Sequence, residues 1–177
     1  MNNNCAGLSI FHYDSPLGRM TGTVEGEYLT GLWFDGQRHY PPQLGNETGG
    51  DSTAPASRTI SSVKHWLDLY FSGRDPGFVP PTKAEGTAFR QSVWKILTTI
   101  PYGQTMTYGH IAAELSRQEG GKKQSARAVG GAVGHNPISL IVPCHRVIGS
   151  DGSLTGYAGG LDKKVALLEL EGILCDN

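Results

Sequence analysis

Residues 107–137, TYGHIAAELSRQEGGKKQSARAVGGAVGHNP, decide how the second half of the chain folds. Thr107 can cap one helix and Ser125 can cap a second, because a side-chain oxygen at that position accepts a hydrogen bond from a free amide of the first turn. The apolar residues expected to face the core follow helical spacing in both segments: they are Ile111, Ala112, Leu115, Ala126, Val129 and Val133. Helix, polar linker and helix in this order predict a helix-turn-helix. The linker at 117–124 is long for that motif, whose turn usually takes about three or four residues.

Further helices are predicted on both sides of this motif. Apolar residues repeat at helical spacing from Phe89 to Ile100, and residues 161–170 predict a last helix. Upstream, a stretch rich in proline and glycine at 75–81 interrupts regular structure and marks a boundary. We therefore expect a mainly α-helical second domain over residues 85–174.

The first half of the chain predicts a small α+β domain over residues 1–80. Turn signals such as Asp14-Ser15-Pro16-Leu17-Gly18 divide residues 8–34 into three short antiparallel strands. Residues 36–57 carry few apolar anchors and predict a long surface loop, in which we expect no chemistry. Apolar residues at helical spacing over 60–72 then predict a helix that packs on the sheet.

Composition places few limits on function. The 177 residues carry 15 lysines and arginines against 16 acidic residues, so no strongly charged surface indicates nucleic acid or membrane. Residues 84–177 hold nine basic and eight acidic side chains, against six and eight before them, so a polyanion should prefer the second half. Three cysteines, an odd number, and a polar beginning without a signal segment predict a reduced, cytoplasmic protein.

Cys144 is the strongest candidate for chemistry. It follows the apolar run 138–142, so it lies where a buried element meets a polar turn. The next two residues, a histidine and an arginine, offer the base and the positive charge that favour a reactive thiolate. The alternative is a small buried core residue. Because successive side chains point apart in helices and strands, His145 should act in a tight turn or through a water, with Glu169 or Glu171 bound to its far nitrogen.

The second helix of the helix-turn-helix has an outer face of small residues. Arg127 is followed by Ala128, Gly130 and Gly131, and a helix with so few polar side chains cannot read base edges in a major groove. Small residues with one arginine suit close approach to a minor groove, where Arg127 would fill a vacated position. The alternative is that Arg127 only solvates the helix surface.

Six short motifs in the second half indicate a family. They are PYGQT (101–105), TYGHIA (107–112), ARAVG (126–130), NP (136–137), VPCHRVIG (142–149) and TGYAGGL (155–161). In sequence, order and spacing the chain closely resembles the O6-alkylguanine-DNA alkyltransferases from about Thr87 to Gly172, and the Pro-Cys-His-Arg signature is highly specific. Residues 13–18 are more weakly similar to the amino-terminal domain of that family.

The resemblance implies a ribonuclease-H-like first domain and a winged-helix-like second domain with a helix-turn-helix. The second domain would dock in the minor groove of double-stranded DNA and flip the damaged nucleotide out of the duplex. It would transfer a methyl or other alkyl group from O6-alkylguanine, and from O4-alkylthymine, to Cys144, irreversibly and once per molecule. No cofactor is implied. We expect a monomer, and the sequence leaves cooperative binding along DNA open.

The resemblance also assigns roles to individual residues. Cys144 would be the acceptor, His145 the base that acts through a water, and Glu171 the partner of His145. Asn136 would order the turn before the active site. Tyr108 would help to rotate the 3′ phosphate of the target and to protonate the departing guanine.

The DNA-facing and pocket residues follow in the same way. Arg127 would replace the extruded base, on a helix whose DNA-facing residues also include Ala128, Gly130 and Gly131. The residues implied to line the alkyl pocket are Val142, Val147, Tyr157, Ala158 and Gly159.

Two features depart from the family. The segment 116–124 is longer and more basic than expected between the two helices, so a contact of Lys122 and Lys123 with a DNA strand is open. Some relatives bind zinc through two cysteines and two histidines, but Cys5 is the only cysteine before Cys144. We therefore expect no metal.

Two rival functions remain to be tested. A lesion sensor of the same fold would bind damaged DNA without reacting, but relatives of that kind lack the acceptor cysteine, which is present here as Cys144. A cysteine hydrolase using Cys144 and His145 would turn over, but no flanking sequence resembles a hydrolase signature.

Overall fold

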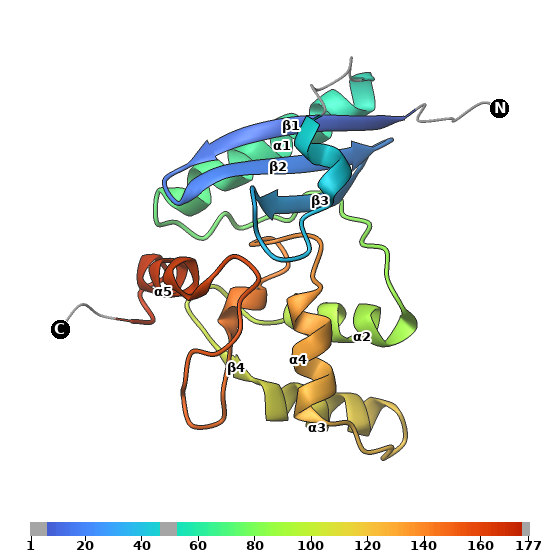
Figure 1. Ribbon diagram of the computed structural model, residues 1–177, viewed down its shortest axis with the longest axis vertical. Coiled ribbons are helices and arrows are strands. Elements are labelled where there is room, and N and C mark those ends of the chain that lie inside the picture. Colours follow the sequence, from blue (N-terminus) through green and yellow to red (C-terminus); the bar gives the residue numbers. More distant parts are fainter. Residues whose placement is uncertain (1–6, 47–52, 175–177) are drawn as a thin grey trace. The chain divides into compact units, whose positions relative to one another are not determined.

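The computed structural model describes residues 7–46 and 53–174, and the chain divides into two compact units (Figure 1). The first unit contains the described residues up to Gly36 together with Tyr40–Ala84. The second contains Gln37–His39 and the chain from Glu85 onward. No helix in the described ranges is long and apolar enough to cross a membrane.

The first unit contains the three predicted strands. They are β1 (Leu8–Ser15), β2 (Gly18–Glu25) and β3 (Tyr28–Phe34), which form an antiparallel sheet in the order β1-β2-β3. Residues 26 and 27 connect β2 and β3, and Gly26 takes a positive φ of 61° there. Glycine adopts that backbone region at little cost, which explains why the turn lies at this point.

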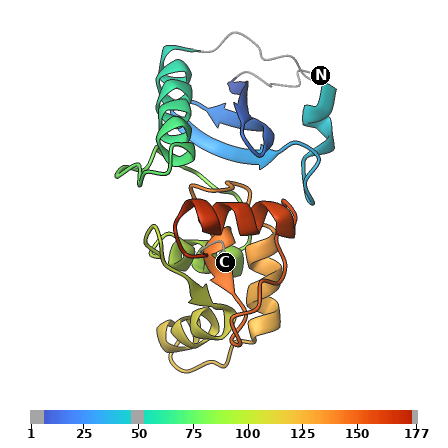
Figure 2. The ribbon, with the colours of Figure 1, turned by 90° about the vertical axis from the view of Figure 1, so that its left-hand side faces the viewer.

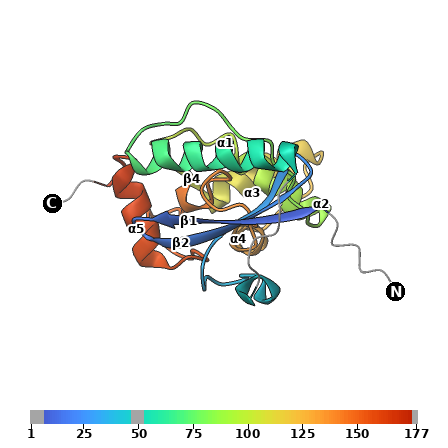
Figure 3. The same cartoon turned by 90° about the horizontal axis from the view of Figure 1, so that it is seen from above.

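Helix α1 (Ala54–Phe71) lies along one face of this sheet (Figures 2 and 3). It contacts all three strands, and the buried side chains between helix and sheet include Met20, Val24, Leu32, Phe34, Val63, Leu67 and Tyr70.

The expected surface loop at 36–57 was wrong at residues 42–46 and from Ala54 onward, and its residues 47–52 lie outside the described residues. The helix begins at Ala54 rather than near Ile60, because the Thr53 side chain accepts a hydrogen bond from the Ala56 amide (3.4 Å) and a proline occupies the first turn. Residues 42–46 form a short 3-10 helix, and Leu44 packs with Ile10 and Trp33. These starting signals come before the apolar stripe, so hydrophobic spacing alone does not find them.

The end of the first unit lies slightly beyond the expected boundary at residue 80. Leu29 donates from its amide to the Pro81 carbonyl (2.8 Å), and Lys83 donates to the Leu29 carbonyl (2.9 Å). These bonds attach residues 81–83 to β3, so the first unit includes the chain to Ala84.

The second unit contains three helices that begin at side-chain caps. They are α2 (Ala88–Leu97), α3 (Tyr108–Gln118) and α4 (Ala126–Gly134), capped by Thr87, Thr107 and Ser125. The caps predicted at Thr107 and Ser125 are therefore confirmed. Trp94 of α2 donates from its indole to the Ala132 carbonyl of α4 (2.8 Å), and the three helices lie together in Figure 1.

The loop between α3 and α4 is shorter than the expected linker, because α3 continues to Gln118. The Ser116 carbonyl accepts from the Gly121 amide (2.7 Å), and the Ser116 hydroxyl accepts from the Gln124 amide (3.0 Å). Lys122 and Lys123 are exposed on this loop.

The rest of the second unit supports the residues after α4. The 3-10 helix η2 (Cys144–Arg146) is followed directly by the short strand β5 (Val147–Ile148). This strand pairs in parallel with β4 (Met106–Thr107), which precedes α3. The predicted last helix is confirmed as α5 (Leu161–Leu170).

Candidate functional site

Asn136 closes the turn that positions Cys144. Its side-chain amide donates to the carbonyls of Val142 (2.8 Å) and Ile138 (3.2 Å), and its side-chain oxygen accepts from the Ile138 amide (3.0 Å). The predicted apolar run at 138–142 is buried, but it forms turns rather than a strand, and Leu140 takes a positive φ of 69°. Asn136 thus supplies hydrogen bonds that a regular element would otherwise provide.

Cys144 is the first residue of η2, and only 4% of its surface is exposed. Burial raises the pKa of the Cys144 thiol, because a thiolate loses hydration there. A hydrogen bond from Asn136 and the positive charge of Lys164 act in the opposite direction and lower this pKa. The net effect is a raised pKa, so the thiol needs a base to become a nucleophile, and Asn136 and Lys164 only reduce the cost of forming the thiolate.

His145 and Glu171 meet in the interior. The His145 Nε2 atom lies 2.6 Å from Glu171 Oε1, and both side chains are fully buried. Burial, the largest effect, lowers the pKa of His145, although the Glu171 carboxylate opposes the shift. A neutral imidazole that donates from Nε2 to a carboxylate carries its lone pair on Nδ1. Of the two glutamates left open by the sequence, Glu171 contacts His145 and Glu169 is exposed.

Arg146 binds the same carboxylate. Its Nε donates to Glu171 Oε2 (2.8 Å), a second nitrogen donates to Oε1 (3.0 Å), and a third donates to the Ile100 carbonyl (2.7 Å). Burial alone would raise the pKa of Glu171, but the bonds from His145 and Arg146 lower it to about 2. The expectation that Arg146 provides the positive charge beside Cys144 was wrong: Arg146 is paired with Glu171, and the nearby charge is Lys164.

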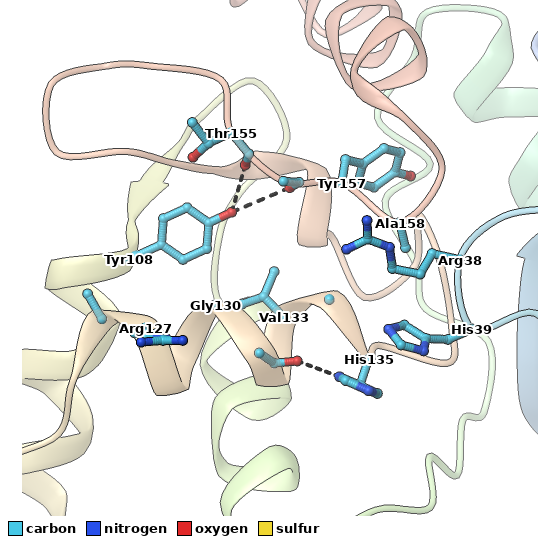
Figure 4. A pocket seen from close by; sticks show the side chains of 14 residues that line it. Arg38, His39, Tyr108, Arg127, Gly130, Val133, His135, Thr155, Tyr157 and Ala158 are labelled. Carbon is cyan, nitrogen blue, oxygen red and sulfur yellow. Dashed lines mark hydrogen bonds between the residues drawn. The ribbon is translucent and has the colours of Figure 1, made fainter.

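An open cavity of about 450 Å³ lies in the second unit (Figure 4). Its lining comes mainly from α4 and from the segment 155–158, and it includes the expected DNA-facing residues Tyr108, Arg127, Gly130 and Gly131. The Arg127 side chain is exposed. The Tyr108 hydroxyl donates to the Thr155 carbonyl (3.0 Å). Burial raises the pKa of both Tyr108 and Tyr157, and the negative charge of Cys144 in its thiolate form adds to this shift.

The expected pocket residues fall into two groups. Tyr157 and Ala158 line the cavity, and the buried Tyr157 hydroxyl has no hydrogen-bond partner in the described part of the chain. Val142, Val147 and Gly159 do not line this cavity. Because Cys144 does not line this cavity either, the expected place of these three residues in the alkyl pocket stays a prediction. Val142 and Val147 are buried in the turn and strand that flank η2, and Gly159 follows the lining segment.

Several lining residues were not predicted as site residues, among them Arg38, His39 and His135. Arg38 and His39 come from the segment that was expected to be a loop without chemistry, and His135 follows α4. The Arg38 amide donates to the Ala158 carbonyl (3.0 Å), and the His39 ring stacks on the His135 ring with centroids 3.9 Å apart. A positive φ of 62° at His39 accompanies this approach. No spacing or motif in residues 36–57 indicated it.

No metal centre is formed within residues 7–46 and 53–174: three or more histidine, cysteine, aspartate or glutamate side chains do not gather as metal ligands anywhere in these ranges. Cys5, the only cysteine before Cys144, lies outside the described residues.

Comparison with known proteins gives consistent matches. A family model described as 6-O-methylguanine DNA methyltransferase, DNA binding domain, matches residues 88–173. The methylated-DNA–protein-cysteine methyltransferase of Mycobacterium bovis is 44% identical over 165 residues, which are 92% of this chain and 93% of the relative. The enzyme of that name from Haemophilus influenzae is 39% identical over 163 residues, 92% of this chain and 85% of the relative.

Solved structures agree with these sequence matches. The crystal structure of Mycobacterium tuberculosis O6-methylguanine methyltransferase is 45% identical, with a TM-score of 0.76 over 93% of this chain and 92% of the other. The crystal structure of Mycobacterium tuberculosis OGT in complex with DNA is also 45% identical, with a TM-score of 0.77 and 92% of both chains covered.

Proposed function

The chain belongs to the family of methylated-DNA–protein-cysteine methyltransferases, and we propose that Cys144 is the cysteine to which it transfers the alkyl group. The activity is direct-reversal DNA repair, in which a group on the O6 atom of guanine in DNA moves to a cysteine of the protein. The observation that carries the choice of Cys144 is its position in η2, beside the Asn136 turn and the His145–Glu171 pair.

His145 is the proposed base. Because Nε2 faces the Glu171 carboxylate, Nδ1 is the nitrogen that takes the thiol proton, through a bridging water. The sulfur of Cys144 then forms a bond to the alkyl carbon while the bond from that carbon to O6 breaks, and the electron pair stays on guanine. The guanine regains a proton, for which the Tyr108 hydroxyl is the proposed donor. The product is a thioether, so each molecule reacts once.

The geometry of α4 supports a mode of DNA binding. Gly130 and Gly131 have no side chains, so another molecule can approach the backbone of α4 closely at this point. Both line the cavity, and the exposed Arg127 lines it too. We propose that this face enters the minor groove, that Ala128 lies against the groove, and that Arg127 fills the space left by the flipped nucleotide. The same reaction would extend to O4-alkylthymine.

The finer architecture is part of the same proposal. Three antiparallel strands with one covering helix suit a ribonuclease-H-like first unit, and α3 followed by α4 suits a winged-helix-like second unit. We propose that the protein acts as a monomer in the cytoplasm, where a nucleophilic thiol stays reduced.

Intact mass tests the proposal against its rivals. The protein is incubated with an excess of duplex containing O6-methylguanine, and we expect the mass of one methyl, located on Cys144, with no second turnover. The variant in which Cys5 and Cys175 are both serine is the matched control and should gain the same methyl. Tight binding with no mass change would support a lesion sensor, and repeated turnover of unmodified protein would support hydrolysis.

A further inference from the structure

Lys164 is a buried charged residue to which the proposed mechanism assigns no step. It lies on α5 with none of its surface exposed, and its Nζ donates to the carbonyls of Val147 (2.5 Å), Thr155 (3.2 Å) and Gly156 (3.5 Å). Val147 directly follows η2, whereas Thr155 and Gly156 line the cavity. A buried ammonium requires such partners. Lys164 therefore connects the strand after Cys144 to the wall of the cavity.

Tyr108 donates to two of the same acceptors. Its hydroxyl lies 3.0 Å from the Thr155 carbonyl oxygen and 3.5 Å from that of Gly156, and Figure 4 shows the ring directed at this segment. Because a carbonyl oxygen has two lone pairs, it can accept from both donors at once. Two side chains from different helices, α3 and α5, thus hold one short segment of the cavity wall.

The held segment has little regular structure of its own. Residues 149–160 contain no helix or strand, and Gly152 and Gly156 take positive φ values of 80° and 62°. A stretch of this kind has many alternative backbone conformations. Its position therefore depends on the bonds that anchor it.

The two donors differ in what else they must do. A hydroxyl has one proton, so Tyr108 cannot serve DNA or the departing guanine while it donates to Thr155. An ammonium has three protons, and those of Lys164 are directed at Val147, Thr155 and Gly156. We propose that Lys164 is a positioning residue that keeps the Thr155–Gly156 segment in place when the Tyr108 hydroxyl leaves it for the substrate. This inference rests on the proposed function for the substrate role of Tyr108.

Shared anchoring predicts that the two residues are not independent. Either donor alone should hold the segment, and removal of both should release it. The test compares Tyr108→Phe, Lys164→Met and the double variant. Amide hydrogen exchange over residues 150–158 of the free protein is the first readout. Each single variant should keep near wild-type protection, and the double variant should lose about tenfold or more.

Transfer rates provide the second readout. On lesion-bearing duplex, the double variant should react more slowly than the product of the two single effects predicts. Lys163→Met, which removes one charge from the same helix, is the matched control. Its effect on the transfer rate should be the same whether residue 108 is tyrosine or phenylalanine. The proposal would be overturned if Lys164→Met slowed transfer by the same factor in wild type and in Tyr108→Phe. That result would mean that Lys164 acts only on the Cys144 thiolate.

The test remains decisive if Lys164→Met fails to fold. Tyr108→Phe alone must then keep the protection of residues 150–158, because Lys164 is still present, and a loss in that variant would overturn the inference. The exchange measurement uses no DNA. A protein whose Cys144 gains no methyl but whose segment shows shared anchoring would refute the proposed function and leave the anchoring intact.

Discussion

Replacement of Glu171 by glutamine should strongly destabilise the protein. The carboxylate accepts from His145 Nε2 (2.6 Å), from Arg146 Nε and a second Arg146 nitrogen (2.8 and 3.0 Å), and from the Gly103 amide (3.1 Å). Glutamine has nearly the same shape but no charge, and its amide nitrogen would face one of these donors. The guanidinium of Arg146 would be left buried without its counterion.

The loss of free energy of unfolding can be estimated from the buried ion pair and from the lowered pKa of Glu171, and the two estimates agree. Removal of one partner of a buried ion pair typically costs about 3 to 5 kcal/mol. A carboxyl whose pKa falls from 4.5 to about 2 on folding stabilises the fold by about 3 kcal/mol at neutral pH, since a tenfold change in proton affinity is worth about 1.4 kcal/mol. We therefore expect Glu171→Gln to lower the free energy of unfolding by about 3 kcal/mol at pH 7.

The loss of stability in Glu171→Gln depends on pH. A carboxyl with a lowered pKa contributes its full stabilisation above its unfolded pKa, and the contribution disappears as pH falls towards the folded pKa. For Glu171 this window runs from about 4.5 down to about 2. The difference in stability between wild type and Glu171→Gln should therefore be constant above the window and shrink within it.

Urea unfolding followed by circular dichroism measures this difference. Glu169→Gln is the matched control, because Glu169 lies two residues away and is exposed, and its effect should stay within about 0.5 kcal/mol. A loss below about 1 kcal/mol for Glu171→Gln, or a difference that does not change between pH 5 and pH 3, would refute the assignment of Glu171 as the buried anion of this site.

Three further outcomes follow from the proposed reaction. Cys144→Ala should abolish alkyl transfer while lesion-duplex affinity, measured by fluorescence anisotropy, stays within a few-fold of wild type; a large loss of binding would contradict a purely chemical role. Arg127→Ala should weaken binding to lesion-bearing duplex and slow transfer from it, because the unstacking cost is less compensated, and equal slowing of transfer from the free base O6-benzylguanine would show that Arg127 does not replace an extruded base. Complete benzylation of Cys144, verified by mass, should lower the melting temperature, since overpacking a buried site costs about 1 to 3 kcal/mol; an unchanged or higher temperature would show that the site has room for the adduct.

Most of the fold of the second unit could be predicted because its signals are local. Thr107 and Ser125 act as caps through bonds to amides three residues ahead, and α5 begins and ends at the predicted residues. The start of α1 was missed because Thr53 and Pro55 precede the apolar stripe. The side of the cavity formed by Arg38 and His39 was missed for a different reason. Its contacts join residues far apart in sequence, and periodicity within one segment cannot show them.

In the candidate site too, the sequence motif identifies neighbouring residues but not the contacts between residues far apart in the chain. The motif places Cys144, His145 and Arg146 in sequence, which suggests one cluster around the thiol. In η2, however, successive side chains leave the axis about 120° apart, and both His145 and Arg146 contact Glu171. Asn136 and Lys164 act on Cys144 instead, from α4's end and from α5. A motif can therefore identify a nucleophile, while the groups that tune it are set by packing between elements.

This division has a chemical consequence for the thiol. Burial raises the pKa of Cys144, and the His145 ring is already committed at Nε2 to a carboxylate. A protonated, buried thiol reacts slowly with small electrophiles in solution, because the thiolate is the nucleophile. In the proposed reaction, the thiol proton leaves through a water to Nδ1 of His145 when the alkylated base is bound. Because the protein forms a thioether and reacts only once, the slow reaction of the buried thiol with other electrophiles preserves Cys144 until it meets a lesion.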